Sequence, residues 1–291
     1  MTEIIKTSGS FASHDGTQIY YETRGTGEAI ILIYGICCQM NHWHHQMTYF
    51  AKNYQVIAFD LRGHHKSGAP KDNSQLGINA AALDLVSLMK HLNLKSAHFV
   101  GHSFGTPVLI QLCDEAPELV RSLTFINGFS KNPIKGMFGL DIVEPFYYFV
   151  KQQYEANPEL VDALWKVSTD NPLAIWASAF AGGFNLKLTQ FKDIEIYARG
   201  VSQVPLSAFL PMFEDLMRFD GENILRKITA PTLVLSGEKD AVTPLRFQEH
   251  MHKMIRGSEF VVVPYGSHCT QLDFPEYTNL KIESHLKRAS E

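Results

Sequence analysis

One stretch of five residues says most about the fold of this chain: Gly101-His102-Ser103-Phe104-Gly105. It follows a short, mostly apolar run at 96–100 and precedes a pattern with helical spacing at 106–112. A serine on a sharp turn between a strand and a helix needs strained backbone angles and neighbours with little or no side chain. Gly101 and Gly105 meet that need. The stretch therefore predicts a nucleophile elbow that lifts the Ser103 hydroxyl to the start of a helix.

Strand-like and helix-like segments alternate on both sides of this stretch. Some strand-like segments are continuous apolar runs, as at 30–33, which is typical of parallel strands buried on both faces. The alternation predicts an α/β fold with a mostly parallel, doubly wound sheet. An Asp-Gly pair at 15–16 predicts a hairpin turn before the first of these strands. The expected strands are 18–23, 29–34, 54–59, 97–100, 123–127, 232–236 and 259–263, and the expected helices are 42–52, 78–92, 104–116, 245–255 and 274–288.

The alternation stops between about residues 130 and 221. This part is rich in aromatic side chains, and six prolines divide it into short helical patterns. The simplest interpretation is a helical cap at 130–221 inserted between two consecutive strands of a core domain formed by 1–129 and 222–291. Some of its aromatic side chains are expected to line a pocket where the cap meets the sheet.

The composition excludes several classes of function. The 291 residues are 45% hydrophobic and 19% charged, which is ordinary for a globular protein. A net charge of −4 with scattered basic residues argues against nucleic acid as a partner. No apolar stretch approaches the roughly 20 residues that span a membrane. The first residues lack a signal-peptide pattern and the four cysteines form no disulfide framework, so a cytoplasmic location is expected.

A serine hydroxyl becomes a useful nucleophile when a base takes its proton and a third group orients that base. Asp240 stands in a loop just past the apolar run 232–236, and His268 stands just past the last expected strand. Both positions lie at the carboxyl ends of strands, where sites form in open α/β sheets. Glu238 and Asp273 are competing acids. The position directly after a buried strand favours Asp240.

Three motifs together resemble one family of enzymes: the elbow, the loop from Gly237 to Pro244 (Gly-x-x-Asp-x-x-x-Pro), and the final Gly-x-His. The chain resembles α/β-hydrolase fold enzymes with a helical cap, over about residues 11–288. The resemblance implies that Ser103 attacks an acyl carbon, that His268 carries the proton, and that Asp240 orients His268.

The resemblance also implies an oxyanion hole made by the backbone N–H groups of Phe104 and Ile36. The sequence departs from the family pattern at two positions near this expected oxyanion hole. Tyr34 stands where the family usually has histidine, and His65 stands where a glycine is expected, so a positive φ there would strain the backbone. Dehalogenases and epoxide hydrolases of this fold carry aspartate at the elbow, and Ser103 argues against both activities.

Other polar groups near these motifs have a structural and a functional interpretation. The cluster Asn41-His42-Trp43-His44-His45 could suggest zinc, with His64 and His65 near in space, but a helix start with solvated histidines is the favoured interpretation. Cys37, Cys38 and Cys269 are expected to be small buried thiols. Asn127 occupies a place where some members of the family keep their acid, a task that an amide cannot perform.

These inferences favour a serine hydrolase that cleaves a small, largely apolar carboxylic ester or lactone through an acyl-enzyme, without cofactor or metal. A carbon–carbon bond hydrolase and a cofactor-free perhydrolase would use the same residues and stay open as alternatives. A ligand sensor of the same fold that hydrolyses slowly is a third alternative. The sequence is compatible with a monomer or a homodimer.

Overall fold

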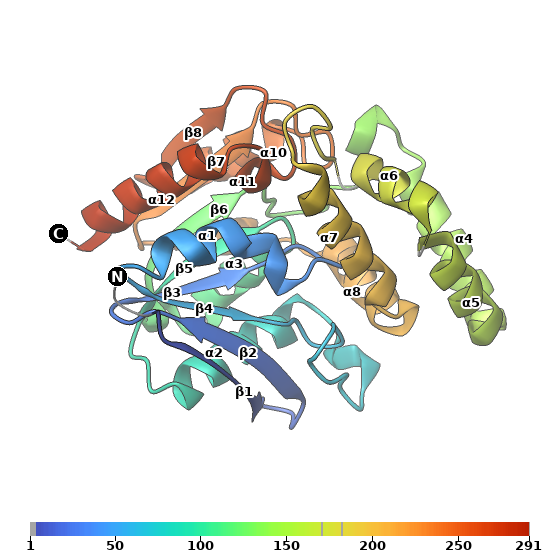
Figure 1. Ribbon diagram of the computed structural model, residues 1–291, viewed down its shortest axis with the longest axis horizontal. Coiled ribbons are helices and arrows are strands. Elements are labelled where there is room, and N and C mark those ends of the chain that lie inside the picture. Colours follow the sequence, from blue (N-terminus) through green and yellow to red (C-terminus); the bar gives the residue numbers. More distant parts are fainter. Residues whose placement is uncertain (1–3, 170, 182, 291) are drawn as a thin grey trace.

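The computed structural model describes residues 4–169, 171–181 and 183–290. Its described residues form an eight-stranded sheet in the order β1-β2-β4-β3-β5-β6-β7-β8 (Figure 1). Strands β1, β2 and β4 pair antiparallel, and every other pairing is parallel. The predicted mostly parallel sheet is therefore confirmed. The strands are β1 (Lys6–Ala12), β2 (Gln18–Arg24), β3 (Ala29–Ile33), β4 (Gln55–Phe59), β5 (Ala97–His102), β6 (Val120–Ile126), β7 (Thr232–Gly237) and β8 (Glu259–Val263).

Strand β1 is present in the structure but is not among the strands that the sequence predicts. It lies at the edge of the sheet, and Phe11 is its only buried residue. Because the other six side chains face solvent fully or in part, the strand carries no apolar pattern to reveal it. The hairpin turn expected at the Asp-Gly pair 15–16 does join β1 to β2, with Gly16 at a φ of 84°.

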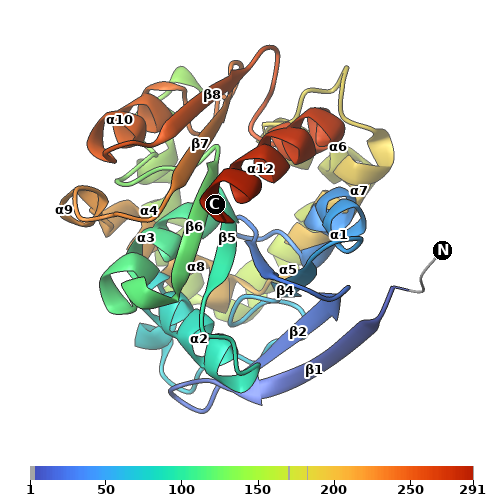
Figure 2. The same cartoon turned by 90° about the vertical axis from the view of Figure 1, so that its left-hand side faces the viewer.

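Strands β3, β5 and β7 lie in the interior of the sheet because their residues are mostly apolar. All five residues of β3 and all six of β5 and β7 are buried, as continuous apolar runs in parallel strands predict. Helices α1 and α12 cover one face, and α2, α3, α9 and α10 cover the other (Figure 2). Short 3₁₀ segments are η1 (Met40–Trp43), η2 (Asn73–Gln75), η3 (Pro117–Leu119) and η4 (Met137–Gly139). The helices are α1 (His44–Phe50), α2 (Ile78–His91), α3 (Gly105–Glu115), α9 (Glu222–Leu225), α10 (Arg246–Met254), α11 (Thr270–Asp273) and α12 (Pro275–Ser290).

In the described part of the chain, the five helices α4 to α8 lie between β6 and the short helix α9. Figure 1 shows them on one side of the sheet, with α7 and α8 next to it and α4, α5 and α6 farther out. An isolated bridge from Lys131 to Asp220 joins the two ends of this part of the chain. The division into a core (1–129 and 222–291) and a cap (130–221) stays our prediction, which this arrangement supports. These helices are α4 (Val143–Ala156), α5 (Pro158–Thr169), α6 (Pro172–Ala181), α7 (Phe191–Gln203) and α8 (Leu206–Arg218).

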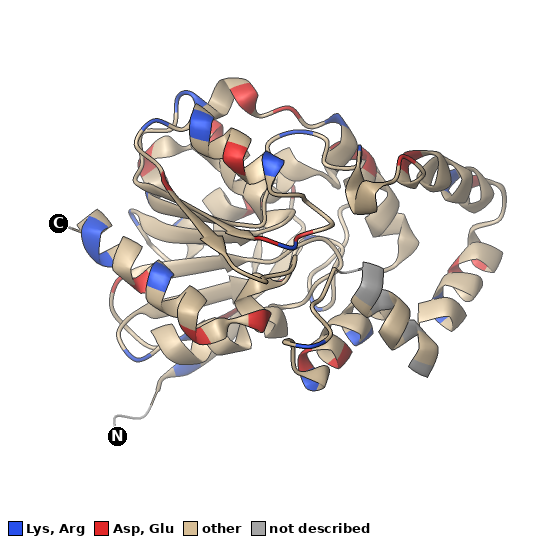
Figure 3. Ribbon diagram, turned by 90° about the horizontal axis from the view of Figure 1, so that it is seen from above, with Lys and Arg blue, Asp and Glu red and all other residues tan. Residues whose placement is uncertain are grey.

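Proline explains where several of these helices begin. Helices α5 and α6 start at Pro158 and Pro172, where the missing N–H and the fixed φ of proline suit the first turn. Among the described residues, no helix combines the length and the apolar character needed to cross a membrane. Acidic and basic positions are interspersed along the ribbon (Figure 3).

Candidate active site

Ser103 occupies the turn between β5 and α3. Its φ is 52°, a left-handed conformation that is strained for a residue with a side chain. A Cβ on Gly101 would lie 2.8 Å from the carbonyl oxygen of Gly105, and a Cβ on Gly105 would lie 2.4 Å from that of Ile33. Glycine is therefore the residue that fits at both positions. The geometry is that of the expected elbow, and it fixes Ser103 beside the first turn of α3.

Three side chains from three loops meet at the carboxyl edge of the sheet. The Oγ of Ser103 lies 3.0 Å from Nε2 of His268, and Nδ1 of His268 lies 2.9 Å from Oδ2 of Asp240. All three residues are buried, and Ser103 is the most exposed at 9%. The contacts place hydroxyl, imidazole and carboxylate in the order that proton transfer from serine requires. The structure thus brings together the three residues singled out from sequence.

The carboxylate of Asp240 is held by its own loop. Its Oδ1 accepts hydrogen bonds from the backbone N–H groups of Val242 and Thr243, both at 2.9 Å. The hydroxyl of Thr243 lies 2.8 Å from the other oxygen, Oδ2, which also faces His268. These contacts together fix the direction of the carboxylate. Sequence reasoning missed Thr243, although its place three residues after the acid was available as a signal.

The two competing carboxylates have other partners. The exposed Glu238 accepts a hydrogen bond from the backbone N–H of Tyr265 at 3.0 Å. Asp273 accepts one from the backbone N–H of Ser267 at 2.6 Å. Neither carboxylate forms a hydrogen bond to the imidazole of His268 within the described part of the chain. The geometry favours Asp240.

Asn127 ties the acid loop to the histidine loop. Its side-chain Nδ2 donates to the carbonyl oxygens of Ser267 and His268, at 3.0 and 2.6 Å. Its Oδ1 accepts from the backbone N–H of Gly237 at 2.6 Å, just ahead of Asp240. The amide therefore sets the separation of the two loops. An amide has both donors and an acceptor, so it makes these three contacts, whereas an ionised carboxylate has no donor.

Two backbone N–H groups that could bind an oxyanion lie beside Ser103. Within the described residues, neither Phe104 N–H nor Ile36 N–H donates a hydrogen bond. The loop after β3, which carries Ile36, packs closely against the elbow, because a Cβ on Gly35 would lie 3.0 Å from the Cβ of Ser103. Free N–H groups in that place are suited to an oxyanion at the reacting carbon. The sequence-based choice of Phe104 and Ile36 stays a prediction that this geometry supports.

Two histidines from the loop after β4 hold the loop that carries Ile36. The backbone N–H of Cys37 donates to Nε2 of His64 at 3.2 Å, and Nδ1 of that ring lies 3.1 Å from the carbonyl oxygen of Arg62. Nε2 of His65 lies 2.7 Å from the carbonyl oxygen of Cys38 and donates to it. Burial lowers the pKa of His64 to about 4, so its ring is neutral at neutral pH and accepts the Cys37 hydrogen bond. Sequence reasoning gave these histidines no such role.

The two departures from the family pattern have structural explanations. The hydroxyl of Tyr34 donates to Asp60 at 3.2 Å and accepts from the backbone N–H of Leu61 at 2.8 Å, which joins the loops after β3 and β4. His65 does have a positive φ, of 45°. The strain of that conformation is offset in part by the hydrogen bond that its ring makes to the Ile36 loop.

A cavity of about 370 Å³ opens next to Ser103 and His268. The loops at the sheet edge form its floor and helices α4, α5, α7 and α8 form its walls. Among the described residues, none of its lining side chains is Asp, Glu, Lys or Arg. The apolar side chains that these four helices contribute to the lining are Val143, Phe146, Tyr147, Val150, Trp165, Tyr197, Val201, Leu206, Phe209, Leu210, Phe213 and Leu216.

The cysteines expected to be buried thiols are buried. Cys37, Cys38 and Cys269 are each at most 5% exposed and line the cavity. Burial raises the pKa of the Cys37 thiol to about 12 and shifts those of the other two upward as well. The thiols therefore stay protonated and contribute apolar surface.

Among the described residues, two groups of side chains have donor atoms close enough to hold a metal ion. In the first, formed by Cys38, His42 and His102, the two imidazole rings stack 4.8 Å apart. The second group is formed by His44, His45 and Asp193. The expectation that the histidines after Asn41 are solvated is wrong for His42, which is 2% exposed, because its ring packs behind the elbow.

Comparisons with known proteins agree with this fold. The family model described as alpha/beta hydrolase fold matches residues 28–275. The chain is 25% identical to the (E)-2-((N-methylformamido)methylene)succinate hydrolase of Acinetobacter baylyi, over 94% of this chain and 96% of that protein. It is 26% identical to epoxide hydrolase 4 of Mus musculus, over 94% and 77%. An esterase from Exiguobacterium antarcticum superposes with a TM-score of 0.80 at 22% identity, covering 97% of this chain and 100% of that one. The chain thus belongs to the alpha/beta hydrolase fold family and is an enzyme of the hydrolase class.

Proposed function

We propose that this hydrolase cleaves a small, uncharged, largely apolar carboxylic ester or lactone through an acyl-enzyme on Ser103. One observation carries the proposal. The Ser103–His268–Asp240 chain of contacts opens onto a cavity whose described lining has no charged carboxylate, ammonium or guanidinium group. A nucleophile of this kind acts on an acyl carbon, and such walls favour an apolar substrate.

The proposed reaction assigns one role to each of these groups. Nε2 of His268 takes the Ser103 proton as Oγ attacks the acyl carbon, and Asp240 stabilises the imidazolium that forms. The N–H groups of Phe104 and Ile36 bind the developing oxyanion, each donor contributing about 3 kcal/mol. His268 then protonates the leaving alcohol, and the same groups activate water to release the acid.

The identity of the nucleophile distinguishes the proposed ester hydrolysis from epoxide hydrolysis, the activity in the name of one relative. An epoxide hydrolase of this fold is expected to use an aspartate at the elbow, whose carboxylate attacks an alkyl carbon. Ser103 occupies that position here. An alkoxide formed by a histidine base suits an acyl carbon instead.

The cavity also predicts which acyl groups are accepted. A carboxylate on the substrate would be desolvated without a cationic partner, which is strongly unfavourable. We expect 4-nitrophenyl butyrate to be hydrolysed with a kcat/KM at least about 100-fold above that of 4-nitrophenyl hemisuccinate, a substrate of similar size. A kcat/KM that is equal or higher for the hemisuccinate would contradict an uncharged substrate.

A series of esters from acetate to dodecanoate, assayed beside a neutral lactone, measures the size of acyl group that fits. A wild-type enzyme inert on all of these would overturn the ester and lactone proposal. A vinylogous diketone, and a carboxylic acid with peroxide, would then test the carbon–carbon hydrolase and the perhydrolase. Tight ligand binding with turnover far below one per minute would indicate the sensor.

A further inference from the structure

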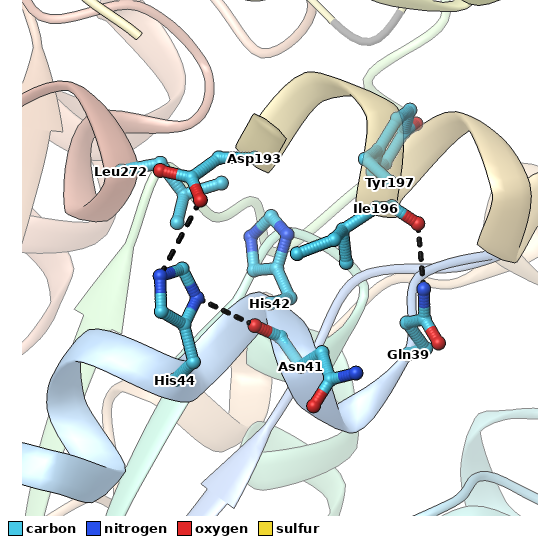
Figure 4. Close-up of a pocket in the computed structure, with 8 residues that line it drawn as sticks. All are labelled: Gln39, Asn41, His42, His44, Asp193, Ile196, Tyr197 and Leu272. Atoms are coloured by element: carbon cyan, nitrogen blue, oxygen red, sulfur yellow. Dashed lines mark hydrogen bonds and ion pairs between the residues drawn. The ribbon is translucent and has the colours of Figure 1, made fainter. Parts of the chain in front are cut away.

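A second polar cluster lies where the start of α1 meets α7, and the proposed hydrolysis does not use it. Asp193 of α7 directs each carboxylate oxygen at one imidazole of α1. Its Oδ1 lies 3.3 Å from Nε2 of His44, and its Oδ2 lies 3.3 Å from Nε2 of His45. Figure 4 shows Asp193 above His44, with Asn41 on the other side of the His44 ring. The three side chains thus converge from two separate helices.

The hydrogen bond on the far side of His44 fixes its tautomer. Nδ1 of His44 lies 2.8 Å from the carbonyl oxygen of Asn41, which can only accept, so Nδ1 carries the hydrogen. The neutral ring then has a lone pair on Nε2, directed at Oδ1 of Asp193. Asp193 is 2% exposed, and its Oδ1 receives no hydrogen bond from the described residues. Two facing acceptors with no hydrogen between them call for a cation.

The spacing suits a metal ion. Zn²⁺ binds imidazole nitrogen and carboxylate oxygen at about 2.1 Å, which separates two ligands of a tetrahedral site by about 3.4 Å. Nε2 of His44 and Nε2 of His45 each lie 3.3 Å from a different oxygen of Asp193, and one donor atom from each of the three residues lies within 4.8 Å of the others. His44 also has the outer hydrogen bond that usually orients a metal-binding histidine.

We propose that His44, His45 and Asp193 bind one divalent transition-metal ion, with Zn²⁺ as the preferred species, and that a water molecule completes the tetrahedron. Two imidazoles and one carboxylate form a donor set that Zn²⁺ favours over Mg²⁺ or Ca²⁺. The histidine side chains are partly exposed, at 30% and 22%, which gives the ion a path from solvent.

The ion would join the inserted helices to the sheet domain. Helix α7 also contacts the loop after β3 through Gln39, whose Nε2 donates to the carbonyl oxygen of Ile196 at 2.6 Å (Figure 4). Tyr197, the next residue along α7, lines the cavity beside Ser103. Metal binding at Asp193 would therefore stabilise one wall of the cavity. The site is structural, and its existence does not depend on the proposed esterase activity.

The test is thermal unfolding of the full chain, first treated with a chelator and then titrated with Zn²⁺. We expect the Tm of the wild type to rise by at least about 3 °C at saturating Zn²⁺. Asp193→Asn and His45→Asn should lose that rise. Glu195→Gln should keep it, because Glu195 is a carboxylate of the same helix that pairs with Arg199.

Co²⁺ provides a second readout that is independent of stability. The wild type should develop the visible absorption of tetrahedral Co²⁺ with one ion per chain, and Asp193→Asn should not. The proposal is overturned if Zn²⁺ leaves the wild-type Tm unchanged, or if Asp193→Asn retains both signals. A thiolate-to-Co²⁺ absorption band would place the ion at Cys38 and would also overturn it.

Discussion

Replacing Ser103 with alanine should lower kcat/KM for the best 4-nitrophenyl ester by about 10⁴ to 10⁶-fold, which is roughly 5–8 kcal/mol of transition-state stabilisation. The reason is that alanine leaves the proposed oxyanion donors and the cavity in place but removes the hydroxyl that we propose His268 activates for attack. The Oγ of Ser103 is the group 3.0 Å from Nε2 of that histidine. KM should change little, since the apolar walls are untouched.

Two controls make this result specific. Ser168→Ala removes an exposed hydroxyl on α5 and should retain wild-type kcat/KM. The Tm of Ser103→Ala should stay within about 2 °C of the wild type, because the substitution removes one oxygen and leaves the glycines of the elbow unchanged. A variant that folds normally and still hydrolyses the ester within tenfold of the wild type would exclude Ser103 as the nucleophile.

The second large effect is expected at Asp240. Asp240→Asn keeps the size of the side chain, but its amide presents a donor or a neutral oxygen to Nδ1 of His268. The imidazole would then lose the carboxylate that fixes its tautomer and stabilises its charged form. We expect kcat to fall by about 10³ to 10⁴-fold.

Glu238→Gln is the matched control, because it removes a carboxylate two residues away that contacts Tyr265 instead of His268. It should retain kcat within about threefold. Equal losses in both variants would mean that the loop as a whole, and not the Asp240 carboxylate, supports activity. Asp273→Asn, by contrast, removes an acceptor of the buried Ser267 N–H and should mainly lower the Tm.

The sequence predicted those parts of the fold whose conformation depends on residues that are close together along the chain. The elbow follows from two glycines around one serine, and the buried central strands follow from continuous apolar runs. Asp240 and His268 could be placed because each follows a recognisable strand. Strand β1 could not be predicted, since an edge strand with one buried side chain has no apolar periodicity.

The contacts that support the candidate active site could not be predicted from the sequence, because they join residues that are far apart along the chain. Asn127 lies 141 positions from His268, to whose carbonyl it donates, and only the sheet order brings the two together. His64 likewise meets the backbone of Cys37 because β3 and β4 are adjacent. The contacts between Asp193 of α7 and the two histidines of α1 depend on how the inserted helices pack. No local sequence pattern specifies that packing.

The central claim is that Ser103 forms a covalent acyl-enzyme, and labelling by a neutral alkyl fluorophosphonate tests it most directly. Intact-protein mass spectrometry should show one adduct per chain, and peptide mapping should place it on Ser103. Ser103→Ala should take up no label. Labelling of Ser103→Ala at the wild-type rate, or an adduct mapped to any other residue, would contradict the account.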